Sequence, residues 1–342
     1  MPRGRAARVM SAGLTAIALF VTSVQSTAQA TSAAPAANAR WCDVLPRKAN
    51  AALERVDVRS EWFTVYRVQP GVFALVEADQ FQESISYLIV GNRRALMFDT
   101  GIGLVPIRPV VEQLTQLPVD VLNSHTHYDH VGGNAEFDRV LALGIPYTRA
   151  NARGFLHAAL AGEVAPESFC HGAPLGADTA NFHTRPWKAS RIVSDGERLD
   201  LGGRVLEILR VPGHTPDALA LLDRANGLLW TGDTYYDAPI WLYVPETDLD
   251  AYERSMVRLV ALAPLVRHLL PAHNTASASP ANLARALDAI RHVRAGTAKG
   301  VEQSGNRVVF DFGDFSILTS KALLAGKKGK RTRGGSGLTV WP

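Results

Sequence analysis

Short apolar runs separated by turn residues fill the first third of the chain. Each run has the length and the β-branched and aromatic content typical of a strand, and Pro-Gly or Gly-Asn pairs stand between several of them. The four predicted strands are residues 62–68, 72–77, 84–90 and 94–99. Hairpin spacing of this kind predicts antiparallel neighbours. A helical apolar period over 105–117 and a further strand over 119–123 follow.

The centre of the chain changes from regular to irregular. Residues 149–161 have a helical pattern, whereas residues 162–190 show no clear period and contain Pro166, Pro174 and Pro186. A segment this long without a pattern is either a functional loop or a flexible insertion. The sequence leaves both interpretations open.

A second run of strands follows in the C-terminal half. The predicted strands are residues 191–193, 198–202, 204–211, 219–223, 227–233, 267–273, 307–312 and 315–320. Two runs of strands, each followed by helices, predict an α/β fold in which two mixed sheets lie face to face with helices outside. We expect this αββα sandwich rather than a doubly wound parallel sheet, because several neighbouring strands are hairpin-spaced.

Two helices are predicted between these later strands. Thr247, followed three residues later by Asp250, predicts a helix that begins there and ends near residue 262. Ser279-Pro280 predicts a helix to about residue 293, because serine is a favoured N-cap and proline suits the first helical position.

The ends of the chain differ from its middle in composition. Arg3, Arg5 and Arg8 precede an apolar segment over 9–24, and Ala28-Gln29-Ala30 offers a small-x-small cleavage site. This is the build of a secretory signal peptide, and the apolar segment is too short and too rich in Ser and Thr for a membrane anchor. We therefore expect a periplasmic or secreted protein without an integral membrane segment after signal removal. The expected divisions are a signal peptide (1–30), an N-terminal linker (31–60), a folded domain (61–326) and a basic, disordered tail (327–342).

The net charge of +4 comes from the two ends. The signal segment contributes three positive charges and the tail stretch 327–333 contributes five, with no acidic residue in either, so the rest of the chain has a net charge of −4. The basic tail could contact anionic lipid or nucleic acid, but we interpret it as a solvated end. We therefore predict no nucleic-acid partner.

The chain has two cysteines, Cys42 and Cys170. In an oxidising compartment they could form one disulfide between the N-terminus of the mature chain and the irregular central segment. The alternative is two separate buried thiols.

Groups that can bind metals gather in "HTHYDH", residues 125–130, directly after a predicted buried strand. His125 and His127 are two apart, so at an extended strand end they point to the same side. Such groups are costly to bury unless something compensates them. Asp129 and His130 lie where the chain then turns toward a Gly-Gly pair. Three more candidates stand at the ends of strand-like runs, beside Gly or Pro: His214, Asp233 and His273.

A single histidine is usually a core or surface residue without a special role. Five of the ten histidines here stand at strand ends, which chance does not readily explain, and we assign no role to the other five. Imidazole and carboxylate groups without a thiolate suit zinc in a hydrolytic site, with iron or manganese as alternatives.

These motifs resemble those of the metallo-β-lactamase superfamily. "HTHYDH" is similar to its His-x-His-x-Asp-His motif, and "PGHTP", "TGDT" and "PAH" resemble its later metal motifs in the same order. "FDTG" resembles its first motif, whose aspartate (here Asp99) is usually structural. The resemblance covers roughly residues 60–320 and implies an αβ/βα sandwich with the metals at one edge of the sheets.

The resemblance also implies a ligand set for two Zn²⁺ ions. The first ion would be held by His125, His127 and His214, the second by Asp129, His130 and His273, and both by the bridging Asp233. Two cations a few ångströms apart would lower the pKa of a water that they share. They would thereby supply a metal-bound hydroxide that attacks a carbonyl. Asp129 could also orient this nucleophile or accept its proton.

The resemblance restricts the substrate less strongly. True β-lactamases of the superfamily typically have Cys or Ser where this chain has Asp233, and a bridging aspartate is typical of the glyoxalase II, lactonase, phosphodiesterase and sulfatase branches. Acyl-homoserine lactonases have a tyrosine three residues beyond it, like Tyr236 here, whose hydroxyl meets the substrate carbonyl. Alternatively Tyr236 only packs, as most single tyrosines do.

We therefore expect an exported dinuclear zinc hydrolase for a carboxylic ester, most of all a lactone. The alternatives are a β-lactamase and then a thioesterase of the glyoxalase II type. The partner is accordingly a small-molecule ester, lactone or lactam. A binding module that has kept the fold without turnover is the alternative from another class, and the filled ligand positions argue against it. The sequence does not indicate an oligomeric state.

Overall fold

The computed structural model of the chain describes residues 41–326. The predicted signal peptide (1–30) and basic tail (327–342) lie outside the described residues. Within residues 41–326, no helix is both long enough and apolar enough to cross a membrane.

The first sheet contains eight strands that pair in chain order. Its first five strands are antiparallel neighbours, and β5 through β8 are parallel. The strands are β1 (Glu54–Val56), β2 (Thr64–Gln69), β3 (Val72–Val76), β4 (Ile85–Val90), β5 (Ala95–Phe98), β6 (Val119–Leu122), β7 (Val140–Leu143) and β8 (Arg191–Val193). The helices along this half are α2 (Arg108–Leu114), α3 (Tyr128–Val131), α4 (Pro146–Asn151) and α5 (His157–Leu160), with 3-10 helices η2 (Asn134–Glu136), η3 (Ala161–Val164) and η4 (Pro166–Ser168).

The second sheet contains five strands in the order β14-β12-β11-β10-β9. They are β9 (Arg198–Asp200), β10 (Val205–Arg210), β11 (Leu219–Asp223), β12 (Leu228–Gly232) and β14 (His268–Pro271). A smaller sheet has the order β13-β17-β16-β15, formed by β13 (Pro239–Leu242), β15 (Val301–Gln303), β16 (Arg307–Asp311) and β17 (Ser316–Ser320). The helices of this half are α6 (Leu249–Leu262), η5 (Ala263–Leu265), α7 (Ala281–Arg294) and α8 (Lys321–Leu324).

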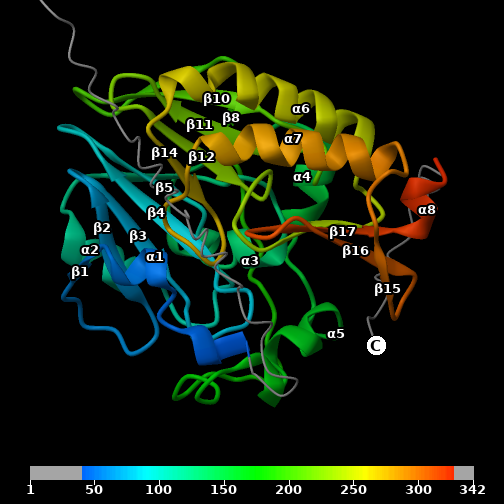
Figure 1. Cartoon of the computed structure of the whole chain (residues 1–342). Helices are drawn as coiled ribbons and strands as arrows, with labels where there is room; N and C mark the ends of the chain where they lie inside the picture. Colours follow the sequence, from blue (N-terminus) through cyan, green and yellow to red (C-terminus); the bar gives the residue numbers. More distant parts are fainter. Residues whose placement is uncertain (1–40, 327–342) are drawn as a thin grey trace, which may run out of the picture. The chain divides into compact units, whose positions relative to one another are not determined.

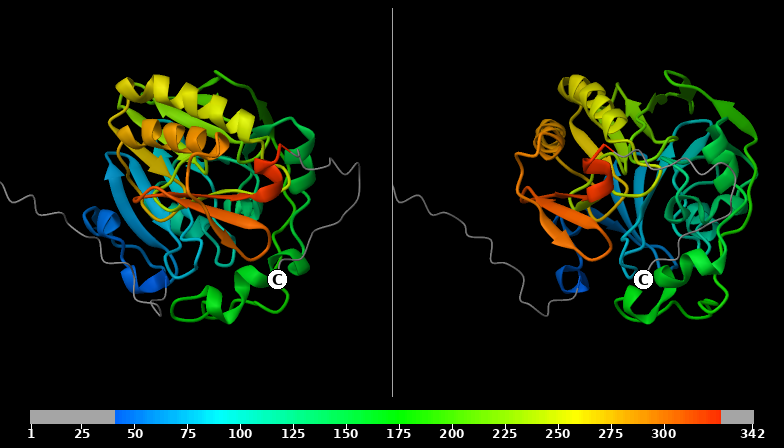
Figure 2. Two further views of the ribbon diagram at one scale, coloured as in Figure 1. Left: turned by 45° about the vertical axis from the view of Figure 1, so that its right-hand side comes forward. Right: turned by 90° about the vertical axis from the view of Figure 1, so that its right-hand side faces the viewer.

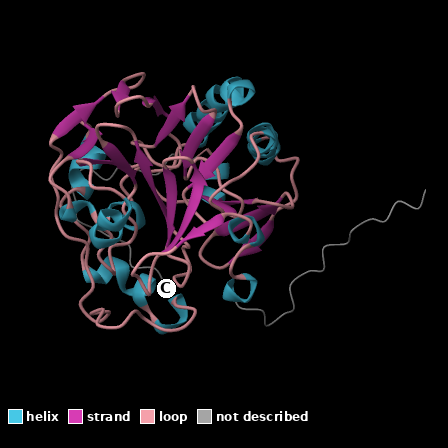
Figure 3. Ribbon diagram, turned by 90° about the vertical axis from the view of Figure 1, so that its left-hand side faces the viewer, coloured by secondary structure: helices cyan, strands magenta, loops and turns pink. Residues whose placement is uncertain are grey.

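Three apolar clusters hold the layers together. Residues of both large sheets form the central cluster, where the fully buried rings of Tyr87 and Trp230 meet edge to face at 6.4 Å. A second cluster lies between the five-stranded sheet and α6 and α7, which run side by side in Figure 1, and a third joins the eight-stranded sheet to α2. Figures 2 and 3 show the strands in the middle and helices on both outer sides. The predicted αββα sandwich is confirmed.

The predicted linker over 31–60 is wrong from residue 41 onward. There the chain forms η1 (Trp41–Val44), α1 (Lys48–Ala51) and β1. Cys42 forms a disulfide with Cys170, as one of the two alternatives predicted, and the Asn50 side chain donates to Asn274 O at 2.8 Å and accepts from Ala276 N at 2.7 Å. These long-range contacts order a segment whose own sequence has little apolar pattern.

The helix predicted over 149–161 is broken into α4 and α5. Gly154 between them has a φ of +83°, a left-handed conformation that ends a helix, and its backbone packs directly against the carbonyl of Thr184. The N-cap of α6 is Asp248, which accepts from Ala251 N, and not the predicted Thr247. The sequence prediction also missed the short strands β7 and β13.

Candidate metal centre

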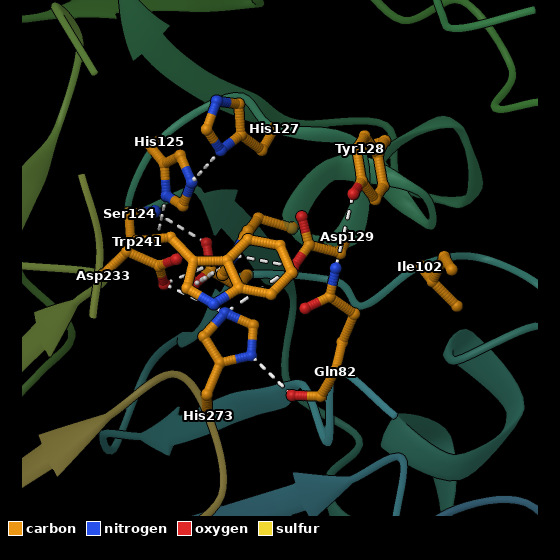
Figure 4. A network of polar contacts seen from close by, with 12 residues as sticks. Gln82, Ile102, Ser124, His125, His127, Tyr128, Asp129, Asp233, Trp241 and His273 are labelled. Carbon is orange, nitrogen blue, oxygen red and sulfur yellow. Dashed lines mark hydrogen bonds and ion pairs between the residues drawn. The ribbon is translucent and has the colours of Figure 1, made fainter. Parts of the chain in front are cut away.

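The seven predicted ligands meet where strands of both large sheets end. His125 and His127 follow β6, while Asp129 and His130 lie in the single-turn helix α3. The other three follow β10, β12 and β14, respectively: His214, Asp233 and His273. Figure 4 shows side chains from both halves of the chain pointing toward one another. The structure therefore brings all seven candidate ligands together. That they bind metal stays a prediction.

Three imidazole nitrogens form the first group. His127 Nδ1 lies 3.0 Å from His125 Nε2 and 3.1 Å from His214 Nε2. One candidate nitrogen from each ring lies within 4.8 Å of the others. This is a triad of nitrogen donors facing a common point, as a first metal ion requires.

The second group contains Asp129, His130 and His273. Asp129 Oδ2 lies 3.2 Å from His130 Nε2 and 3.6 Å from His273 Nε2. Asp233 stands between the two groups, since its Oδ1 lies 3.1 Å from His273 Nε2 while its Oδ2 lies 3.6 Å from His214 Nε2. Its two oxygens thus face different groups, which is the arrangement of a bridging carboxylate.

Outer hydrogen bonds fix the histidine tautomers. Nδ1 of His214 donates to Trp241 O and Nδ1 of His273 donates to Gln82 O, both at 2.7 Å. Nδ1 of His130 lies 3.0 Å from Asp99 Oδ2, where the superfamily motif led us to expect a structural aspartate. In these three rings the proton is therefore on Nδ1 and the Nε2 lone pair faces the centre, as metal-binding histidines are usually held.

A buried aspartate joins the two loops that contribute the first group. Asp217 accepts hydrogen bonds from the hydroxyls of Thr126 (2.5 Å), Thr148 (2.9 Å) and Thr215 (2.8 Å). Thr126 lies between His125 and His127, and Thr215 directly follows His214. Asp217 therefore fixes the spacing of the triad. The sequence prediction missed it, because two of its three partners, Thr126 and Thr148, are 91 and 69 residues away.

Burial and charge set the protonation of these side chains. Burial lowers the pKa of His125 well below its usual range and that of His214 to about 4, so both rings are neutral and can bind metal. Burial opposes ionisation of the carboxylates, but His130 and His273 lower the pKa of Asp129 to about 2. The same two histidines hold the pKa of Asp233 well below its usual range. The carboxylates in turn raise the pKa of His130, despite its burial.

Two orphaned atoms show that this donor set fits metal ions. His130 Nε2 and Asp233 Oδ1 are buried without a hydrogen-bond partner among the residues that the structure describes. Unsatisfied buried polar atoms are costly, and both atoms belong to the predicted ligands and point into the cluster. Divalent cations would satisfy them and compensate the two carboxylates, so the residues present fit a dinuclear metal centre.

Tyr236, the predicted catalytic tyrosine, lies beside the second group. Its ring centre is 5.1 Å from that of His273, and its hydroxyl accepts from Trp241 N at 3.1 Å. Because this bond uses an oxygen lone pair, the hydroxyl proton is free to be donated. Figure 4 shows the indole of Trp241 in front of the cluster, and this side chain is only half-buried.

Comparison with known proteins agrees with this geometry. A family model of the metallo-beta-lactamase superfamily matches residues 82–291. The acyl-coenzyme A thioesterase MBLAC2 of Gallus gallus is 29% identical over 228 residues, which is 62% of this chain and 81% of that protein. A hydroxyacylglutathione hydrolase of Aeromonas hydrophila is 28% identical over 170 residues, 49% of this chain and 52% of its own length.

A solved structure resembles the fold. The stereoselective inverting sec-alkylsulfatase Pisa1 from Pseudomonas sp. matches with a TM-score of 0.54 and 17% identity, over 68% of this chain and 42% of that one. At this identity the likeness concerns the fold alone. The family match, in contrast, spans more than half of the chain and includes all seven candidate ligands. The chain therefore belongs to the metallo-β-lactamase superfamily and is a hydrolase of that fold.

Proposed function

We propose that the chain is an exported dinuclear zinc hydrolase that cleaves a carboxylic thioester or ester. The observation that supports this most directly is the position of Asp233, with one oxygen toward His273 and the other toward His214. A carboxylate so placed can hold two ions at once. Imidazole and carboxylate ligands without thiolate favour zinc.

The chain's residues divide into ligands and groups that act on the substrate. His125, His127 and His214 would hold one ion, Asp129, His130 and His273 the other, and Asp233 both. When bound, the pair supplies a Lewis acid for the carbonyl and an acidified water as nucleophile.

Two side chains assist at stated atoms. The Asp129 carboxylate can orient the attacking water by accepting its hydrogen bond, since a carboxylate oxygen is an acceptor. The Tyr236 hydroxyl can donate to the carbonyl oxygen as negative charge develops there.

An acyl thioester is the substrate class we place first. Two relatives that match over 81% of their length are named acyl-coenzyme A thioesterases, and hydroxyacylglutathione hydrolases also match, over a smaller share. The sequence alone favours lactones and then lactams over thioesters. The relatives' names reverse this order, because Tyr236 is the main support of the lactone prediction.

A lactone is the second candidate, favoured by one observation. The Tyr236 hydroxyl lies beside the second ligand group with its proton free to be donated, as the lactonase prediction requires. A β-lactam is less favoured, since Asp233 stands where true β-lactamases typically have Cys or Ser.

Export is part of the proposal and has two supports. Residues 1–30 have the build of a signal peptide, and Cys42 and Cys170 form a disulfide of the kind that persists in oxidising compartments.

One assay tests the reaction and the metal together. Purified mature protein is analysed for bound zinc and assayed on a medium-chain acyl thioester, an acyl-homoserine lactone and a chromogenic cephalosporin. We expect two zinc ions per chain and the highest kcat/KM on the thioester. Asp233→Ala should hold fewer than two ions and lose more than about 100-fold in turnover, because even outer partners of metal ligands contribute 10–100-fold.

The control is Asp200→Ala, which removes an exposed carboxylate paired with Arg93 far from any ligand motif, and it should match the wild type. The highest rate on the lactone would replace the thioester by the second candidate. Hydrolysis of none of the three, or full metal content and turnover in Asp233→Ala, would contradict the proposed function.

A further inference from the structure

His127 differs from the other predicted histidine ligands in orientation and exposure. It faces the centre with Nδ1, whereas His125, His214 and His273 use Nε2. Its side chain is 17% exposed, against 3% for His214 and 5% for His273. Packing therefore restrains the His127 ring less than the others, so its orientation depends more on what its outer nitrogen contacts.

The outer nitrogen of His127 faces a carboxylate from the other half of the chain. Nε2 lies 3.3 Å from Oε1 of Glu246, in the loop between β13 and α6. The same oxygen accepts a hydrogen bond from the hydroxyl of Tyr147 in α4 at 2.7 Å. The carboxylate is thus held from one side by Tyr147 and presented to His127 on the other.

This contact decides which nitrogen of His127 can bind metal. A neutral imidazole has one N–H and one lone pair, and a carboxylate can only accept. With Glu246 at Nε2, the proton resides on Nε2 and the lone pair on Nδ1, which is the atom that faces His125 and His214. A carboxylate partner also makes the imidazole a better ligand than a carbonyl partner does, since it adds negative charge.

We propose that Glu246, held by Tyr147, is a positioning residue that orients His127 and strengthens binding of the first metal ion. This inference rests on the metal centre of the proposed function and is independent of the substrate. No sequence motif indicates it, because Glu246 and Tyr147 lie about a hundred residues apart.

The test is metal affinity and not turnover. Metal-free protein is titrated with Zn²⁺ in competition with a chromophoric chelator, in the wild type and in Glu246→Gln, Glu246→Ala and Tyr147→Phe. The same titration in a His273→Ala background, which leaves the first group intact, assigns the change to that group. We expect Glu246→Gln to weaken zinc binding there by about 10–100-fold. Tyr147→Phe should weaken it less, because the carboxylate remains.

Two measurements separate positioning from general structure. Glu163→Gln is the matched control: this carboxylate accepts hydrogen bonds from Tyr128, Gln80 and Gln82 and from no predicted ligand, so zinc affinity should stay close to the wild-type value. The rise in melting temperature on adding zinc should be smaller in Glu246→Gln than in the wild type, each compared with its own metal-free protein.

Unchanged affinity in both Glu246 variants would overturn the role of Glu246 while leaving the metal centre intact. A lower melting temperature of the metal-free protein with unchanged affinity would show that the residue is only structural. Absence of zinc binding in the wild type would instead overturn the metal centre and this inference together.

Discussion

At the scale of single residues, the candidate metal centre consists of polar side chains that are costly to bury without a partner. His125, His130, Asp129 and Asp233 are each at most 7% exposed, and their hydrogen bonds inside the protein do not satisfy every atom. Outer partners hold the rings so that lone pairs converge. A site built this way is preorganised, which keeps the cost of ordering the ligands out of the metal-binding step.

The hydroxyl of Tyr236 is the residue-scale feature whose role is most easily tested. It lies next to His273 and keeps a proton to donate, since it accepts from Trp241 N. Removing one donor to a developing oxyanion commonly costs about 10²–10³ in turnover. We expect Tyr236→Phe to lower kcat by about this factor on the best substrate, with zinc content and melting temperature unchanged.

Tyr235 provides the matched control for this prediction. Its hydroxyl donates to Asp237, and its ring packs against Phe315. Tyr235→Phe should therefore act on stability and leave kcat close to the wild-type value. Equal kcat in wild type and Tyr236→Phe would remove the main support for the lactone candidate, and a slow Tyr235→Phe would move the role to its neighbour.

At the scale of elements, the sequence predicted whatever a local pattern determines. Most strands lie within one or two residues of their predicted bounds, and α7 begins at Ala281, one residue after the predicted start at Pro280, which is its N-cap. β7 was missed because its apolar run is only four residues long and follows a charged pair, Asp138-Arg139. The order of residues 41–60 was missed because it depends on partners such as Cys170, far away in the sequence.

The candidate site divides in the same way. The seven candidate ligands are marked by local motifs at strand ends, so the sequence alone predicted the cluster that the structure brings together. Glu246 and Tyr147 were missed, because they act on the loop of His127 from other elements. Asp217 lies in the loop of His214, but it was missed as well, because it reaches the loop of His125 through Thr126, which is 91 residues away. The candidate ligands lie in short sequence motifs, whereas the residues that orient them are brought close only by the tertiary structure.

The carboxylate of Glu77 connects the end of β3 to two other segments of the chain, and it makes the free energy of unfolding depend on pH. It directly follows β3, accepts from Trp62 Nε1 at 2.9 Å and from Ile102 N at 3.0 Å, and is fully buried. Burial raises its pKa from 4.5 to about 7, although these two bonds oppose the rise. The folded chain therefore holds this proton more tightly than the unfolded chain does between pH 4.5 and 7.

The sign of the effect follows from this proton. The stabilisation is complete below pH 4.5 and is lost as the pH rises through about 7, by up to about 3 kcal/mol in the free energy of unfolding. The side chain that replaces the carboxylate in the Glu77→Gln variant cannot titrate. The free energy of unfolding of this variant should therefore fall less steeply with rising pH than that of the wild type. Chemical unfolding between pH 5 and 8 measures the difference in slope between wild type and variant. Glu163 also has its pKa raised to about 7, mainly by burial. It contributes equally to the pH slopes of wild type and variant, so its effect cancels in the difference. Parallel slopes would contradict the prediction.

At the scale of the whole molecule, the metal centre and the disulfide both connect distant parts of the chain. Four predicted ligands come from the eight-stranded sheet's half and three from the five-stranded sheet's half. Ions that bind the folded chain and not the unfolded one therefore stabilise the packing of one half on the other. The Cys42–Cys170 bond adds a covalent link between the N-terminal segment and the irregular central segment.

The disulfide should contribute strongly to stability. Its cysteines are 128 residues apart, and closing a loop of this length removes unfolded-state entropy worth up to about 4–5 kcal/mol in the chain-entropy model. We expect the double variant Cys42→Ser/Cys170→Ser to unfold at a lower denaturant concentration than the oxidised wild type. The bond also fixes residues near Phe169, whose ring packs on Trp62 beside the Glu77 contact. Loss of the disulfide should therefore reduce the order of the central segment before that of the rest of the fold.

Reduction separates the bond from the cost of the substitutions themselves. Adding a reductant should lower the unfolding midpoint of the wild type toward that of the double variant and leave the double variant unchanged. Thiol titration of the denatured, unreduced mature protein should find no free thiol, because Cys42 and Cys170 are the only cysteines in the chain. Two free thiols after export to an oxidising compartment would contradict the bond. A reductant that leaves the wild-type midpoint in place would contradict its contribution to stability, since the loop it closes would then cost the unfolded chain nothing.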